Sequence, residues 1–188
     1  MSHRNAGRLA GALFLAAFLL YGGGSAFADN PLGLGLMLLN SAAVATIGIA
    51  AFRALREAAP RTARVYLAAR ALEAVLLALG TLFLASGAAV GNDIAYGAAM
   101  LVLSAGSIPF CRALATQRWV PRWFAWWGVL GYALLAVGAV LEFAVAGSGV
   151  LLAVPGGLFE IAFGLFLLRW GFPEPADRRT PGPVTEAV

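Results

Sequence analysis

The placement of arginine constrains this chain more than any other sequence feature. Except for Arg70, every arginine lies in one of four clusters, which alternate along the chain with connections that contain no arginine. Between these connections lie six apolar stretches, each about long enough to cross the ~30 Å hydrocarbon core of a bilayer as a helix. Since arginine-rich connections stay in the cytoplasm, the pattern predicts six transmembrane helices with both termini cytoplasmic. The clusters are Arg4 and Arg8; Arg53, Arg56, Arg61 and Arg64; Arg112, Arg118 and Arg122; Arg169, Arg178 and Arg179.

The predicted fold class is therefore all-α, a polytopic membrane helix bundle. Hydrophobic residues make up 61% of the 188 residues, and the mean hydropathy is +0.85. A soluble domain of this length has too little interior to bury so much apolar surface, so the expected solvent is the lipid bilayer. Residues 1–170 are predicted to form one six-span domain, and the proline-rich, charged residues 171–188 a disordered cytoplasmic tail. The expected spans are residues 9–28, 32–51, 65–85, 94–111, 123–145 and 150–168.

The first apolar stretch has an alternative interpretation. A basic start, an apolar run and Ala26-Phe27-Ala28 before Asp29 together resemble a cleavable signal peptide. Cleavage would leave five spans and an external N-terminus. The length of the run and the pairing of Gly7 with Gly11, a spacing typical of packed membrane helices, favour a retained helix instead.

Several kinds of chemistry are excluded by composition. The only histidine is His3 and the only cysteine is Cys111, so this chain alone cannot form a disulfide, a histidine-bearing triad or an HExxH-type zinc site. We therefore expect no metal and no cofactor. The net charge of +4 gives no support to nucleic-acid binding, because the arginines flank spans, where they set topology and contact anionic lipid.

Polar residues inside the spans are the best indicators of a functional site, since an ionisable group near the midplane costs at least ~2.5–3.5 kcal/mol. Tyr66, Arg70 and Glu73 share one face of the third span, Glu160 lies near the centre of the sixth, and Asn40 lies at middle depth in the second. We expect these residues to converge in the bundle as a ligand- or ion-binding site. Two carboxylates and one guanidinium leave one uncompensated negative charge, which favours a proton or a cation as ligand.

Other interpretations of these polar residues remain open. Arg70 could simply bridge the two glutamates and hold three helices together. The glutamates of the third and sixth spans also lie at similar positions, eight and ten residues after the two expected spans begin, as in an inverted repeat of three spans plus three. Pro155-Gly156-Gly157 could break the sixth helix and expose backbone groups to a ligand, or form only its flexible first turn. Three further tyrosines are expected to be interface or packing residues: Tyr21, Tyr96 and Tyr132.

Five short motifs occur in order along the chain: RLAG at residues 8–11, NS at 40–41, ARALE at 69–73, VPRW at 120–123 and PGGLFE at 155–160. Their order and spacing resemble a bacterial membrane family known as domain of unknown function 4386. The resemblance covers nearly the whole chain up to Phe172. It implies six spans, a retained first helix and a location in the bacterial cytoplasmic (inner) membrane, and it implies no substrate, cofactor or catalytic residue.

Three functions are compatible with the sequence. The first, which the sequence favours most, is a non-catalytic accessory component whose glycine-rich faces contact a second copy of this chain or another membrane protein. The second is a small carrier or proton-handling protein that uses the intramembrane Arg–Glu site. The third, an enzyme acting on a lipid-like substrate with Glu73 or Glu160 as general base, is favoured least, because the chain has no nucleophile motif.

Overall fold

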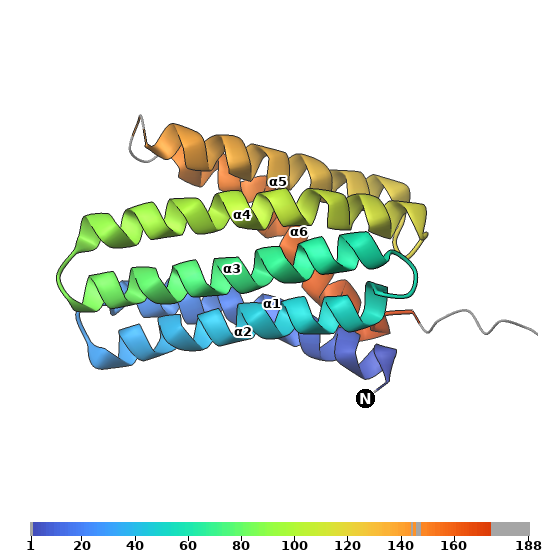
Figure 1. The fold of residues 1–188 in the computed structure, drawn as a ribbon, viewed down its shortest axis with the longest axis horizontal. Helices are drawn as coiled ribbons and strands as arrows, with labels where there is room; N and C mark the ends of the chain where they lie inside the picture. Colours follow the sequence, from blue (N-terminus) through green and yellow to red (C-terminus); the bar gives the residue numbers. More distant parts are fainter. Residues whose placement is uncertain (1, 144, 146–147, 174–188) are drawn as a thin grey trace, which may run out of the picture.

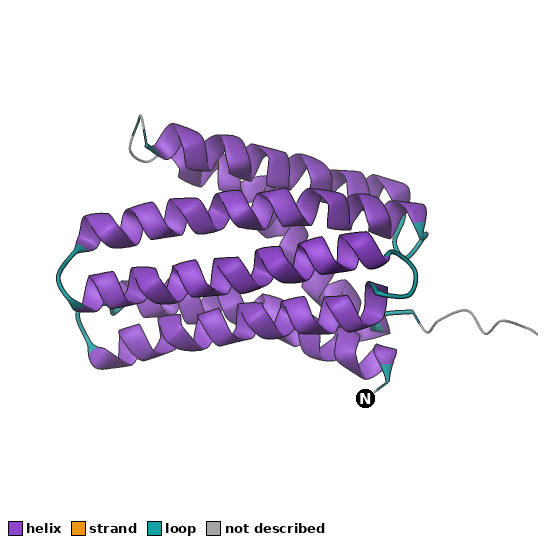
Figure 2. Ribbon diagram, viewed as in Figure 1, coloured by secondary structure: helices purple, strands orange, loops and turns teal. Residues whose placement is uncertain are grey.

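The structure, a computed structural model that describes residues 2–143, 145 and 148–173, contains six long helices. Each helix is long and apolar enough to cross a bilayer, and no strand occurs in the described residues (Figures 1 and 2). The predicted all-α, six-span fold is thus confirmed. The predicted disordered tail falls largely on residues 174–188, outside the described residues. The helices are α1 (His3–Ala26), α2 (Pro31–Leu55), α3 (Pro60–Ala85), α4 (Ala89–Thr116), α5 (Arg122–Glu142) and α6 (Ser148–Trp170).

Local sequence explains where several of these helices begin. Asn30 precedes α2, and its side-chain Oδ1 accepts a hydrogen bond from the backbone N–H of Leu32 at 2.9 Å. Such a cap satisfies one of the N–H groups that a helix start leaves without a partner. Pro31 and Pro60 occupy the first turns of α2 and α3, where the missing N–H of proline costs nothing. The turn between α3 and α4 contains Gly87 with φ +82°, a conformation that favours glycine.

The helices form a closed ring. In the described part of the chain the backbone of each helix lies close to those of the helices before and after it, α1 lies close to α6, and no other pair of helices has its backbones in contact. α1 therefore lies between α2 and α6 and completes the wall. The beginning of α1 and the residues that follow α6 lie side by side, because Gly7 packs directly against Gly171 and Phe172. All the described arginines outside the spans lie at or near this end, which we call the arginine-rich end (Figure 1).

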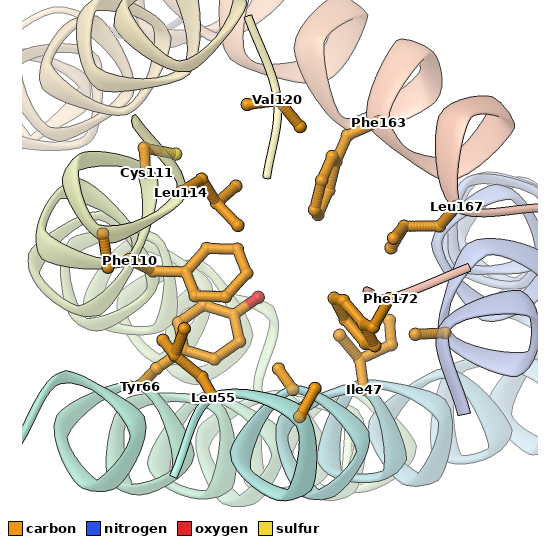
Figure 3. Packing of buried hydrophobic residues seen from close by; sticks show 14 of the residues in the cluster. Ile47, Leu55, Tyr66, Phe110, Cys111, Leu114, Val120, Phe163, Leu167 and Phe172 are labelled. Atoms are coloured by element: carbon orange, nitrogen blue, oxygen red, sulfur yellow. The ribbon is translucent and has the colours of Figure 1, made fainter. Parts of the chain in front are cut away.

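The half of the ring nearest the arginine-rich end is filled with apolar side chains. Figure 3 shows them directed from the surrounding helices toward the interior of the ring. Phe110 stacks on Tyr66 with ring centroids 4.1 Å apart and meets Phe163 edge-on at 6.0 Å. α1 and α6 are in close contact here, since a Cβ added to Gly11 would lie 2.5 Å from the carbonyl oxygen of Gly164. This half is a packed core that closes one end of the ring.

The sequence predicted either a helix break or the first helical turn at Pro155, and the structure shows neither. The helix starts seven residues earlier, at Ser148, and continues through Pro155 to Trp170, so Pro155 neither breaks α6 nor belongs to its first turn. The indole Nε1–H of Trp127 donates to the Pro155 carbonyl at 3.1 Å and attaches this part of α6 to α5.

Candidate intramembrane ligand site

A cavity of about 270 Å³ lies inside the ring, on the side of the packed core away from the arginine-rich end. It is lined mainly by apolar and aromatic side chains, among which stand an amide, two carboxyl groups and a guanidinium. All six helices contribute to the wall, so the cavity is a property of the whole ring. One lining residue from each of α1 to α6, in order, is Phe14, Asn40, Glu73, Tyr96, Tyr132 and Glu160.

Arg70 and Glu73 form an ion pair on the inner face of α3. The Arg70 Nη1 and Glu73 Oε2 atoms are 3.0 Å apart, and each side chain is only 3% exposed. Gly48 of α2 makes room for the Arg70 stem, because a Cβ there would lie 2.7 Å from the Arg70 Cβ. The guanidinium carbon lies 5.6 Å from the ring centroid of Phe14. Arg70 is thus held by a carboxylate and by a cation–π contact.

Glu160 reaches the cavity from α6, whose backbone does not contact that of α3 in the described part of the ring. The hydroxyl of Tyr132 on α5 donates to its Oε1 at 2.8 Å. Close packing of α5 on α6 allows this bond, since a Cβ on Gly131 would lie 2.8 Å from the Gly156 Cα. The Glu160 carboxylate is also within electrostatic range of Arg70. The two glutamates therefore have different partners: Glu73 has the arginine and Glu160 has a tyrosine.

Several polar atoms at the cavity are buried without a hydrogen-bond partner among the described residues. They include Asn40 Oδ1, Arg70 Nε and Glu73 Oε2, the last of which is close to Arg70 but not aligned for a hydrogen bond. Buried polar groups are almost always partnered, because leaving one without a partner costs about 1–3 kcal/mol. A cavity bordered by such atoms can bind a polar or charged group.

The structure places the five predicted site residues in two groups. Asn40, Arg70, Glu73 and Glu160 all line the cavity. Tyr66 is 1% exposed and belongs to the packed core, where it stacks on Phe110 while its ring lies 5.9 Å from the Arg70 guanidinium carbon. It therefore supports Arg70 from beneath the cavity. Whether these residues bind a ligand remains a prediction.

Three tyrosines that the sequence assigned to interfaces or packing also line the cavity: Tyr21, Tyr96 and Tyr132. Tyr21 and Tyr96 stack with centroids 5.2 Å apart, although they come from α1 and α4, which do not contact each other through their backbones. They pack against neighbouring side chains, as expected, and they also form part of the cavity wall. The sequence could have identified Tyr132 as a candidate site residue, because Tyr132 lies near the middle of its span, the criterion that selected Asn40.

A second cavity, of about 450 Å³, lies among α4, α5 and α6 on the side away from the arginine-rich end. It shares Tyr96, Met100, Leu135 and Ala153 with the first cavity, so the two adjoin. We call the second cavity the vestibule. Its described lining contains two acidic residues and no basic one: Asp93 and Glu142. The Glu142 Oε2 accepts a hydrogen bond from the Gly149 N–H at 2.6 Å.

The fold and the cavity define the class of protein: a multi-pass membrane helix bundle with ionisable side chains around an internal cavity. Residues 88–171 match the family model described as "Domain of unknown function (DUF4386)", which confirms the family resemblance over α4, α5 and α6. The matched residues include Tyr96, Tyr132 and Glu160, whereas Arg70 and Glu73 lie outside them. Neither the comparison with curated proteins nor that with solved structures gives a match.

Proposed function

We propose that this protein is a small carrier of the bacterial cytoplasmic membrane that binds its ligand in the central cavity. One observation carries the proposal: the buried charged cluster faces an internal cavity lined by all six helices. A purely structural network would be packed among helices with its polar atoms satisfied. Here Asn40 and Arg70 instead border the cavity with buried atoms that have no partner among the described residues.

The positive-inside rule gives this carrier an orientation. With the arginine-rich end in the cytoplasm, the packed core closes the cytoplasmic side and the vestibule faces the outside. The cavity is then open toward the outer face in this conformation. A carrier requires a second conformation in which the same residues are reached from the cytoplasm.

The packing of the glycines favours the carrier over the accessory component. The accessory interpretation used glycine-rich faces as contact surfaces for other proteins. In the structure Gly11 packs against Gly164 and Gly131 packs against Gly156, so these four glycines mediate contacts inside the bundle and are not available to a partner. Only Gly22, Gly23 and Gly35 among the described helical glycines have nothing within 4 Å of an added Cβ.

The test is the reaction of a single introduced cysteine with a membrane-impermeant thiol reagent, in a Cys111→Ala background. Ala153→Cys reports on the wall shared by the two cavities, and Leu158→Cys is the matched control on the same helix, at a position 53% exposed on the bundle surface. In sealed vesicles of known orientation, we expect Ala153→Cys to react from the outer side, and more slowly from the cytoplasmic side as the carrier turns over. Leu158→Cys, which faces hydrocarbon, should not react.

Each pattern of reaction has one meaning. Reaction of Ala153→Cys from both sides supports a carrier. Reaction from the outer side alone refutes transport and leaves a ligand-binding site. Absence of reaction from either side shows that the cavity has no connection to water, and the site proposal is then wrong.

A further inference from the structure

We infer that the ligand is a small organic cation, an ammonium group attached to an apolar body, which enters through the acidic vestibule and binds between Glu160 and the stacked Tyr21–Tyr96 pair. This inference rests on the proposed function, because it names the chemistry of the ligand bound in the same cavity. Four features of the described residues carry it: charge balance, the aromatic lining, the size of the cavity and the charge of the vestibule.

The charges around the cavity do not balance. Glu73 forms an ion pair with Arg70 at 3.0 Å, whereas Glu160 accepts a hydrogen bond from the neutral hydroxyl of Tyr132 and is within electrostatic range of the same single guanidinium. With both carboxyl groups ionised the cavity carries one net negative charge. An uncompensated charge at membrane depth is costly, so a monovalent cation beside Glu160 would be stabilised there. An anionic ligand would add to the imbalance.

The cavity lining is aromatic where a cation would lie. Tyr21, Tyr96 and Phe18 all line it, and the first two stack 5.2 Å apart. Aromatic faces attract cations, and most strongly where water is excluded, which is how quaternary ammonium groups are recognised. Phe14 already binds the Arg70 guanidinium in this way, and it lines the same cavity.

The size of the cavity favours an organic cation over a bare metal ion. A cavity of about 150 Å³ holds benzene, so a cavity of about 270 Å³ can hold an aromatic ring together with a small ammonium group. A metal ion would fill little of this space and needs several ligands at short distances. Among the described residues no group of three or more His, Cys, Asp or Glu side chains is placed to hold one.

The vestibule is lined by acidic side chains, which would attract a cation on its way to the central cavity. Asp93 and Glu142 line it, and all the described arginines outside the spans belong to the opposite half of the molecule. An acidic cleft with apolar walls raises the local concentration of cations and their rate of association. Tyr96 borders both cavities, so a cation leaving the vestibule meets an aromatic ring at the boundary.

The experiment compares three probes of nearly equal shape for protection of Ala153→Cys against an uncharged thiol reagent. Benzyltrimethylammonium is the cation, neopentylbenzene its neutral isostere and phenylmethanesulfonate the anion. We expect the cation to slow labelling with a half-saturating concentration at least about tenfold lower than that of either other probe, which corresponds to ~1.4 kcal/mol. Glu160→Gln should raise this concentration for the cation about tenfold or more. Glu57→Gln, the same change at an exposed position in the α2–α3 connection, should not alter it.

Two further variants keep the test decisive if Glu160→Gln fails to fold. Tyr96→Leu should weaken protection by the cation and not by neopentylbenzene. Asp93→Asn should slow protection by the cation at low salt and have less effect at high salt. Equal protection by all three probes, or stronger protection by the anion, overturns the cation inference while labelling of Ala153→Cys upholds the cavity. If the impermeant reagent never reaches Ala153→Cys, both the inference and the proposed function fail.

Discussion

The ion pair on α3 makes a quantitative prediction about stability. Glu73→Gln keeps the shape of the side chain and removes the charge that faces Arg70 at 3.0 Å. At an effective dielectric constant of ~20, two unit charges at 3.0 Å attract by roughly 5 kcal/mol. Removing one partner of a buried pair typically costs about 3–5 kcal/mol, because the remaining charge is left buried. We expect the free energy of unfolding of the Glu73→Gln variant to be lower than that of the parent protein by about 3–5 kcal/mol.

Glu160→Gln should behave differently, although it is the same substitution in the same cavity. The Glu160 carboxylate accepts a hydrogen bond from the Tyr132 hydroxyl, and a glutamine oxygen can accept the same bond. The substitution also removes the unbalanced negative charge, so we expect a change within about 1 kcal/mol of the parent. Glu57→Gln on the surface should change the free energy of unfolding by less than ~0.5 kcal/mol.

The assay is reversible unfolding by dodecyl sulfate in mixed micelles, followed by tryptophan fluorescence. The pairing argument adds one more variant: Arg70→Met combined with Glu73→Gln should recover most of the stability lost in Glu73→Gln, since neither charge is then buried alone. If the double variant is as unstable as the single one, an uncompensated Arg70 is not the cause of the loss. If Glu160→Gln is destabilised as strongly as Glu73→Gln, the assignment of separate partners to the two glutamates is wrong.

Further predictions concern the contact between α5 and α6. Gly131→Ala should cost about 1–3 kcal/mol of unfolding free energy, because its Cβ would lie 2.8 Å from the Gly156 Cα. Gly35→Ala is the matched control: nothing lies within 4 Å of an added Cβ, so the same assay should show a gain of about 0.5–1 kcal/mol. Tyr132→Phe should cost about 1.5–3 kcal/mol, the value of a hydrogen bond to a charged group, and much less in a Glu160→Gln background; equal losses in both backgrounds would contradict a bond to a carboxylate.

The sequence was sufficient to predict the fold because the two signals used depend on the bilayer alone. Apolar length determines what can cross a membrane, and arginine placement determines which connections stay inside. The same reasoning selected Asn40, Arg70, Glu73 and Glu160, since a polar residue at membrane depth needs either a partner or water. All four line one cavity.

The remaining features of the site depend on which helices are neighbours, and the sequence does not contain that information directly. Tyr132 is near Glu160 because two glycines bring α5 and α6 together, and Tyr21 meets Tyr96 only because the ring closes through α1 and α6. Pro155 was misjudged for a different reason. Its helix begins at Ser148, earlier than the expected span, so Pro155 lies inside the helix and not at its start.

The partners of the two glutamates also bear on why three charged side chains line the central cavity. A buried ion pair can be replaced by packed apolar side chains with little loss or even a gain of stability, so Arg70 and Glu73 are not required for the ring to form. The charges of Arg70 and Glu73 cancel each other, so this pair by itself needs no further charged group in the cavity. Glu160 is then the residue without a structural reason, because its bond to Tyr132 could be replaced by an apolar contact between α5 and α6. A third charge that leaves the cavity unbalanced, at a boundary with an acidic vestibule, is explained by a cation that supplies the missing positive charge when it binds.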